Sequence, residues 1–275
     1  MEYNQGELMI TRYYFDSCTL QDILRLPVED ANQIVNDFFY NIDGYITNHA
    51  RIEFERNYRG ELARQYSAVK QWKEHVKKLK RGFDFDTRHF LLDFEQYSER
   101  VNKVLEELTF TITNAMKEYK TTDSKKWQAE FVFRNLKLLN LDWDQSKLDQ
   151  ITKEASKRTA KGIGPGLYDQ GKRAKDGTIF NAEGLAYDIR YGDYYIWRQI
   201  LDDVAKLGSS EVVFVTSERK GDWESCYDRL CMELREKHKD TILKIVNIQN
   251  AIEKFSSDSS TAVSADHPCR IPLLF

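Results

Sequence analysis

Apolar residues follow two different periods along the chain, and the change between them divides the sequence into three parts. Runs of apolar and β-branched residues at 10–15, 211–216 and 241–247 are typical of strands. After each run, apolar residues recur three and four positions apart, which predicts a helix. This alternation of strands and helices with short loops predicts an α/β domain with a mostly parallel central sheet and helices on both faces.

The middle of the chain has a different character. Residues 58–158 contain few Gly and Pro, are rich in Lys, Glu, Gln and Leu, and repeat apolar residues at helical spacing. A fully helical insertion fits this segment better than a second sheet domain. We therefore expect a three-layer α/β/α domain formed by residues 1–57 and 159–275, interrupted by a large all-helical insertion at 58–158.

Composition argues against several classes of protein. The longest uncharged apolar run has only the length of a strand, so we expect no membrane span, and residues 1–6 are polar and acidic, unlike a signal peptide. The four cysteines form no CxxC pair and have no zinc-ligand spacing with the five histidines. We expect reduced thiols in a cytoplasmic protein.

Charge is balanced in total but segregated along the chain. The 275 residues carry 41 Lys and Arg against 44 Asp and Glu, yet residues 64–81 hold seven basic side chains and one acid, and residues 153–176 hold seven and three. Dense Lys and Arg bind phosphates, and the interleaved Trp72 and Tyr168 are suited to stacking on bases. An ordinary solvated helix face explains residues 64–81 equally well, whereas the Gly-rich 153–176 favours substrate binding.

Four carboxylates lie where a predicted strand ends or a predicted helix begins, the place at which open parallel sheets bind ligands. They are Asp16, Glu53, Asp193 and Asp222. Without Cys or His ligands, clustered carboxylates favour a hard divalent ion, Mg²⁺ or Mn²⁺, and such ions support phosphodiester hydrolysis. Helix caps and first-turn acids have the same pattern, so the spacing alone leaves both interpretations open.

Five segments, in the same order along the chain, resemble the motifs of PIN-like nucleases that carry a long helical insertion. The segments are 13–25 (YYFDSCTLQDILR), 52–57 (IEFERN), 164–169 (GPGLYD), 191–197 (YGDYYIW) and 213–223 (VFVTSERKGDW). The resemblance implies a PIN-like fold and metal-dependent hydrolysis of single-stranded or structured nucleic acid, with RNA favoured over DNA. It also implies a regulated effector, such as a toxin or an antiviral defence protein.

The resemblance assigns roles to individual residues. It implies that Asp16, Glu53, Asp193 and Asp222 hold Mg²⁺ or Mn²⁺ and that the hydroxyl of Thr216 lies beside them. Together with the charge pattern, it predicts a set of substrate contacts, which are Asn57, Lys161, Tyr168, Asp169, Lys172, Arg173 and Thr216. A regulatory protein partner and oligomerisation stay open.

Two positions depart from the family pattern. Cys18 stands where the family has Asn, and Ser217 and Glu218 replace a pair of Asp residues. The second departure leaves open whether Glu218 or Asp222 completes the metal site. It also keeps an alternative in view, a catalytically degenerate PIN-like scaffold that binds nucleic acid or a protein partner. A nucleotide-binding enzyme is disfavoured, because the glycines at 162–166 do not form a GxxxxGK[ST] loop.

Overall fold

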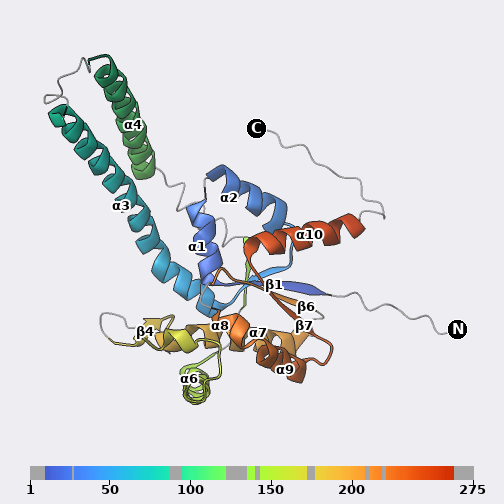
Figure 1. The fold of residues 1–275 in the computed structure, drawn as a ribbon. Coiled ribbons are helices and arrows are strands. Elements are labelled where there is room, and N and C mark those ends of the chain that lie inside the picture. Colours follow the sequence, from blue (N-terminus) through green and yellow to red (C-terminus); the bar gives the residue numbers. More distant parts are fainter. Residues whose placement is uncertain are drawn as a thin grey trace. The chain divides into compact units, whose positions relative to one another are not determined.

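The computed structural model describes residues 10–26, 28–86, 95–121, 135–139, 143–171, 177–207, 211–218 and 221–262. The chain forms two compact units, of which the first comprises Met1–Glu55 and Gln128–Phe275 and the second Arg56–Trp127. Figure 1 shows the elements of both units in the order of the chain.

The first unit is built on a five-stranded sheet in which every neighbouring pair of strands is parallel. The strand order is β3-β2-β1-β6-β7. The bounds are β1 (Thr11–Phe15), β2 (Gly44–Ile46), β3 (Lys137–Leu138), β6 (Glu211–Val215) and β7 (Ile242–Val246). β6 is buried along its whole length, as its continuous apolar run predicts for a strand covered on both faces. The predicted α/β class with a parallel central sheet is confirmed.

Helices cover both faces of this sheet (Figure 1). One face carries α1 (Ser17–Arg25), α2 (Val28–Ile34), the π-helical turn Val35–Phe39 and α10 (Ile248–Ala262). The other side carries α6 (Gln145–Ala160), α7 (Gly192–Leu207), α8 (Asp222–Ser225) and α9 (Tyr227–Lys237). The three-layer arrangement follows, since each helix buries one apolar face.

Successive side chains of the central strands pack into aromatic clusters on opposite faces of the sheet. Phe15 of β1 contacts Phe39 of the π-helical turn, with ring centroids 4.8 Å apart. Tyr14 and its register partner Phe214 face the other side, where Phe214 packs on Trp223 with ring centroids 4.3 Å apart. All five rings are buried. This packing fixes the position of the strand ends that carry the candidate acids.

A small antiparallel hairpin in the first unit was not predicted from the sequence. Its strands are β4 (Ile179–Ala182) and β5 (Leu185–Asp188). The two residues between them, Glu183 and Gly184, have φ angles of 52° and 78°, the left-handed pair that tight two-residue hairpins require. The strands are short and partly exposed, so their apolar pattern is weak. Gly184 was the one residue of the sequence that could have indicated this turn.

The second unit is helical in its described part. It contains α3 (Asn48–Asp86) from Arg56 onward and α4 (Glu95–Thr121). A small core joins the two helices through Val76, Leu105 and Ile112. No helix within the described ranges is long and apolar enough to cross a membrane.

The second unit is shorter than the predicted insertion at 58–158. It ends at Trp127, whereas β3 pairs with β2 of the central sheet and α6 also belongs to the first unit. α6 buries Leu148, Ile151 and Ala155 and bonds to α7 through the hydroxyl of Thr152. Helical periodicity is the same whichever partner a helix packs against, so periodicity could not separate α6 from the insertion helices.

A largely buried ion pair ties α6 to α9 and to the loop that follows α6. Arg158 Nη1 donates to Glu233 Oε1 at 2.5 Å, and Arg158 Nη2 donates to the carbonyl oxygen of Gly164 at 2.6 Å. Trp197 Nε1 donates to the other oxygen of Glu233 at 2.9 Å. Burial alone would raise the pKa of Glu233, but the hydrogen bonds from Arg158 and Trp197 outweigh burial and hold that pKa below its usual value.

Replacing Glu233 with alanine should leave the largely buried Arg158 guanidinium without its carboxylate partner. We expect the free energy of unfolding at pH 7 to fall by about 3 kcal/mol, because a buried charge that loses its partner is costly. Because the folded-state pKa of Glu233 is lowered, the stability that it contributes is present above its ordinary pKa of 4.5 and is lost as the pH falls further. Urea unfolding followed by tryptophan fluorescence measures both effects.

The matched control is Glu236→Ala, which removes an exposed carboxylate from the same helix. This variant should change the free energy of unfolding by less than about 0.5 kcal/mol. Equal, small losses in the two variants would show that the ion pair does not stabilise the fold.

Candidate functional site

The candidate site lies where β1 and β6 end side by side. The strand order places β2 and β6 on opposite sides of β1, so the chain reverses its direction of travel across the sheet at this point, which is where open parallel sheets bind ligands. Phe15 pairs with Val215, and the backbone N–H of Asp16 donates to the carbonyl oxygen of Val215 at 3.0 Å. Asp16 and Thr216 therefore leave the sheet together.

Asp16 begins α1 as its N-cap and is 4% exposed. Its Oδ1 accepts from the backbone N–H of Ser17 at 2.6 Å, and its Oδ2 accepts from Cys18 Sγ at 2.9 Å and from Thr216 Oγ1 at 2.9 Å. Burial raises the pKa of Asp16 to about 6, these hydrogen bonds oppose the rise, and the negative charge of Glu53 adds to it. Asp16 is thus a buried carboxylate surrounded by neutral donors and a second acid.

Glu53 reaches the same place from the second turn of α3, in the part of that helix that belongs to the first unit. Thr47 precedes the helix, and its hydroxyl accepts from the backbone N–H of Ala50 at 3.2 Å. Ser17 Oγ donates to Glu53 Oε2 at 3.1 Å. His49 Nε2, one turn earlier, lies 3.9 Å from Glu53 Oε1. Ser17 therefore connects the two carboxylates of Asp16 and Glu53.

Asp193 lies in the first turn of α7, next to a glycine that lets this helix approach Glu53 closely. A Cβ on Gly192 would lie 2.7 Å from Glu53 Oε1 and 3.1 Å from His49 Nε2, so only glycine fits without displacing a neighbour. Asp193 is 6% exposed. Ser17 thus links Asp16 to Glu53, and the helix turn that bears Asp193 packs against Glu53.

Asp222 makes contacts of a different kind. It is 1% exposed, and it begins α8 directly after Gly221, whose φ is 70°. Asp222 Oδ1 accepts from the backbone N–H of Leu167 at 3.2 Å, and Oδ2 accepts from the backbone N–H of Tyr168 at 3.2 Å. Its carboxylate thus holds the loop that follows α6.

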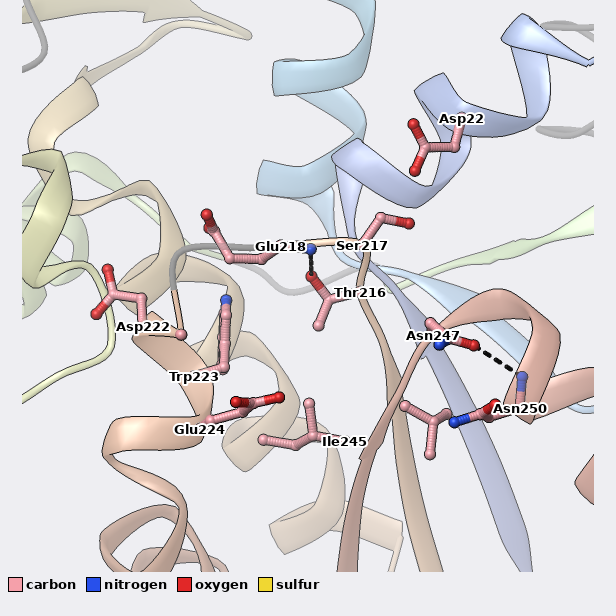
Figure 2. A pocket seen from close by; sticks show the side chains of 12 residues that line it. Asp22, Thr216, Ser217, Glu218, Asp222, Trp223, Glu224, Ile245, Asn247 and Asn250 are labelled. Atoms are coloured by element: carbon pink, nitrogen blue, oxygen red, sulfur yellow. Dashed lines mark hydrogen bonds between the residues drawn. The ribbon is translucent and has the colours of Figure 1, made fainter.

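Glu218 lies beside a cavity of about 390 Å³ at the ends of β6 and β7. Its backbone N–H donates to Thr216 Oγ1 at 3.2 Å, and Figure 2 shows this bond and the labelled side chains around the cavity. In that view the carboxyl groups of Glu218 and Asp222 lie on one side of Thr216, and Asp22 lies on the other. The hydroxyl of Thr216 accepts from the backbone N–H of Glu218 and donates to Asp16, so the backbone of Glu218 lies near Asp16.

The predicted substrate contacts differ in exposure. Lys161 and Tyr168 are exposed, whereas Asp169 is 2% exposed and faces the interior. Asn57 belongs to the second unit. Lys172 and Arg173 lie outside the described residues.

Three site residues were missed by the sequence analysis. Ser17 joins two acids, Gly192 allows their approach, and Cys18 donates to Asp16 and accepts from the backbone N–H of Ser217 at 3.3 Å. Burial raises the pKa of the Cys18 thiol far above its usual value, so the thiol stays protonated and able to donate. The signal for Ser17 and Cys18 was their place directly after Asp16.

Within the described ranges, no three or more Asp, Glu, His or Cys side chains converge closely enough to form a ready metal site. The acids of the site are instead connected one after another. Ser17 donates hydrogen bonds to Asp16 and to Glu53, and Glu53 packs against the start of α7. The arrangement places carboxylate oxygens near the carboxyl ends of β1 and β6, and carboxylate oxygen is the donor type that Mg²⁺ and Mn²⁺ prefer.

Comparison with known proteins agrees with this geometry. A family model described as a PIN like domain matches residues 14–261, a range that includes all four acids and the whole central sheet from Tyr14 of β1 onward. No curated protein and no solved structure matches the chain. Members of this family are usually nucleases, and they generally use divalent metal ions. Because the family model spans most of its length, the chain belongs to the PIN-like domain family.

Proposed function

We propose that the protein is a metal-dependent endonuclease that cleaves single-stranded or structured nucleic acid, with RNA favoured over DNA. Three buried acids on three elements carry the proposal, because hydrogen bonding links the first two and close packing brings the helix of the third against the second. Ser17 joins Asp16 to Glu53, and Gly192 lets the first turn of α7, which bears Asp193, approach Glu53. The acids lie near the carboxyl ends of the parallel strands β1 and β6, where open sheets bind ligands.

The residues of the site fit a hard divalent cation, Mg²⁺ or Mn²⁺. Asp16, Glu53 and Asp193 supply carboxylate oxygens, and all three are buried. Burial and the charge of Glu53 both raise the pKa of Asp16, so a cation would favour the ionised form that the protein alone disfavours. When bound, such an ion supplies a Lewis acid that activates water and offsets the charge of the phosphodiester.

The side chains around the acids orient them. Thr216 and Cys18 both donate to Oδ2 of Asp16, which fixes the plane of that carboxylate. Ser17 does the same for one oxygen of Glu53. Ligand carboxylates held by such neighbours keep their geometry with little loss of entropy on binding. The exposed Lys161 is available to contact backbone phosphates of a bound strand.

Replacing Asp16 or Asp193 with asparagine should abolish cleavage. Each change removes one negative charge from the proposed metal ligands while keeping the shape of the side chain. We expect the wild type to cleave a labelled single-stranded RNA in the presence of Mn²⁺ or Mg²⁺, and both variants to match a sample without protein. Denaturing gel electrophoresis of the products measures cleavage.

The control for this experiment is Asp202→Asn on the same helix as Asp193. Asp202 accepts from Trp143 Nε1 at 3.2 Å, and asparagine retains an oxygen for that bond. Cleavage by this variant should equal that of the wild type. Equal cleavage by Asp16→Asn, Asp193→Asn and wild type would contradict the metal assignment, and absence of cleavage in all of them would favour the non-catalytic scaffold.

Replacing Gly192 with alanine should weaken metal binding without removing any acid. The new Cβ would lie 2.7 Å from Glu53 Oε1, so the Glu53 carboxylate must move. We expect Mn²⁺ affinity, measured by titration calorimetry, to fall by about 10- to 100-fold, the usual cost of disturbing the groups that position a ligand. Stability should change less than metal binding, since the crowded atoms are the ends of the Glu53 and His49 side chains and not backbone.

The matched control is Gly60→Ala in α3, where a new Cβ would meet no atom within 4 Å. Gly60→Ala should bind Mn²⁺ as tightly as the wild type. If Gly192→Ala also bound Mn²⁺ with unchanged affinity, Glu53 would not be a ligand in the position that the structure gives it.

A further inference from the structure

The carboxylate of Asp222 holds a loop that lies more than fifty residues earlier in the chain. Each of its oxygens accepts one backbone N–H, from Leu167 and from Tyr168, both at 3.2 Å. A carboxylate that is 1% exposed must be hydrogen-bonded to offset the cost of burial, and charge-assisted bonds to backbone N–H groups are strong. Asp222 therefore fixes two successive peptide groups of this loop.

The same loop, residues 164–168, is also held at its first residue. Arg158 Nη2 donates to the carbonyl oxygen of Gly164 at 2.6 Å, and the position of a Cβ on Gly164 would lie 3.2 Å from Cys226 Sγ. Gly166 has a φ of 89°, which few other residues adopt. Gln170 Nε2 donates to the carbonyl oxygen of Gly166 at 3.2 Å. The backbone of the loop is thus tied at several points, by the buried Asp222 and by the partly buried Arg158 and Gln170.

This hydrogen-bonded loop, which adjoins the turn bearing Asp193, presents one aromatic side chain to solvent. Tyr168 is 61% exposed, while its neighbour Asp169 is 2% exposed. The position of a Cβ on Gly166 lies 3.6 Å from the Cβ of Asp193, so the loop adjoins the turn that carries this acid. When the backbone is already held by hydrogen bonds, an exposed ring can stack on a planar ligand with little further loss of backbone entropy on binding.

We propose that residues 164–168 form a stacking platform on which Tyr168 binds one unpaired base, and that Asp222 is the positioning residue that holds this platform. The proposal rests on the proposed function, because it takes nucleic acid as the ligand of the adjacent acids. A tyrosine face stacks on any base but reaches it only when the base is not already stacked within a duplex. The platform therefore selects single-stranded over double-stranded substrate.

The first test measures binding without cleavage, on the Asp16→Asn background and with metal chelated. Fluorescence anisotropy of a labelled single-stranded RNA reports affinity. Tyr168→Ala should weaken binding by about 5- to 150-fold, the range for loss of one stacked base, whereas Tyr168→Phe keeps the ring and should bind within about twofold of the parent. For a duplex of the same sequence, Tyr168→Ala should have no effect.

The outcomes separate this proposal from the one on which it rests. If the parent binds single-stranded RNA and Tyr168→Ala binds it equally well, the platform is wrong and the nuclease proposal stands. If the parent binds neither single strand nor duplex, the platform fails, while the nuclease proposal is decided by the cleavage assay of the wild type. Equal weakening by Tyr168→Ala and Tyr168→Phe would show that the hydroxyl, not the ring face, makes the contact, and would overturn stacking.

The second test asks whether Asp222 holds the loop or binds the metal. Asp222→Asn replaces one acceptor oxygen with an amide donor that faces a backbone N–H. We expect faster hydrogen exchange at the amides of Leu167 and Tyr168, weaker binding of single-stranded RNA, and Mn²⁺ affinity within about twofold of the wild type by calorimetry. Unchanged exchange at both amides together with lost Mn²⁺ binding would overturn the positioning role. Tyr168→Ala and Tyr168→Phe alter no buried group, so they test the platform even if Asp222→Asn does not fold.

Discussion

The parallel pairing of β1 with β6 is the constraint on which the candidate site depends. Phe15 and Val215 are in register, so Asp16 and Thr216 end their strands side by side, and the hydroxyl of one can donate to the carboxylate of the other at 2.9 Å. The two strands are held by aromatic packing on both faces of the sheet. A shift of the register by one residue would turn Asp16 to the opposite face of the sheet.

Small residues decide how close the other acids come to Asp16. Gly192 leaves no room for a side chain between α7 and Glu53, and Gly166 brings the loop after α6 against Asp193. A Cβ at Gly192 would crowd Glu53, whereas at Gly166 the positive φ of 89°, and not lack of space, favours glycine. The approach of α7 to Glu53 therefore depends on the missing side chain of Gly192.

The sequence predicted the sheet more completely than the site. A continuous apolar run identified β6, because a strand covered on both faces has no polar side to interrupt it, and runs rich in β-branched or aromatic residues identified β1 and β7. The positions of Asp16 after β1, of Asp193 at the start of a helix and of Asp222 after β6 were predicted as well. The role of Asp222 could not be predicted, since an aspartate in the first turn of a helix has the same local sequence whether its partners are a cation or the N–H groups of Leu167 and Tyr168. Those donors are distant in sequence, and only the folded chain brings them to it.

Burial of the Asp16 carboxyl group makes the free energy of unfolding depend on pH. Burial raises the pKa of Asp16 from 3.8 to about 6, so between these values the folded state holds a proton that the unfolded state has released. The sign follows directly, because stability falls as the pH rises through a window in which the folded state binds more protons. At neutral pH the ionised Asp16 therefore destabilises the fold when no cation is bound. A divalent ion that prefers the ionised carboxylate would reverse this contribution. Metal binding would then stabilise the part of the fold where β1 and β6 end.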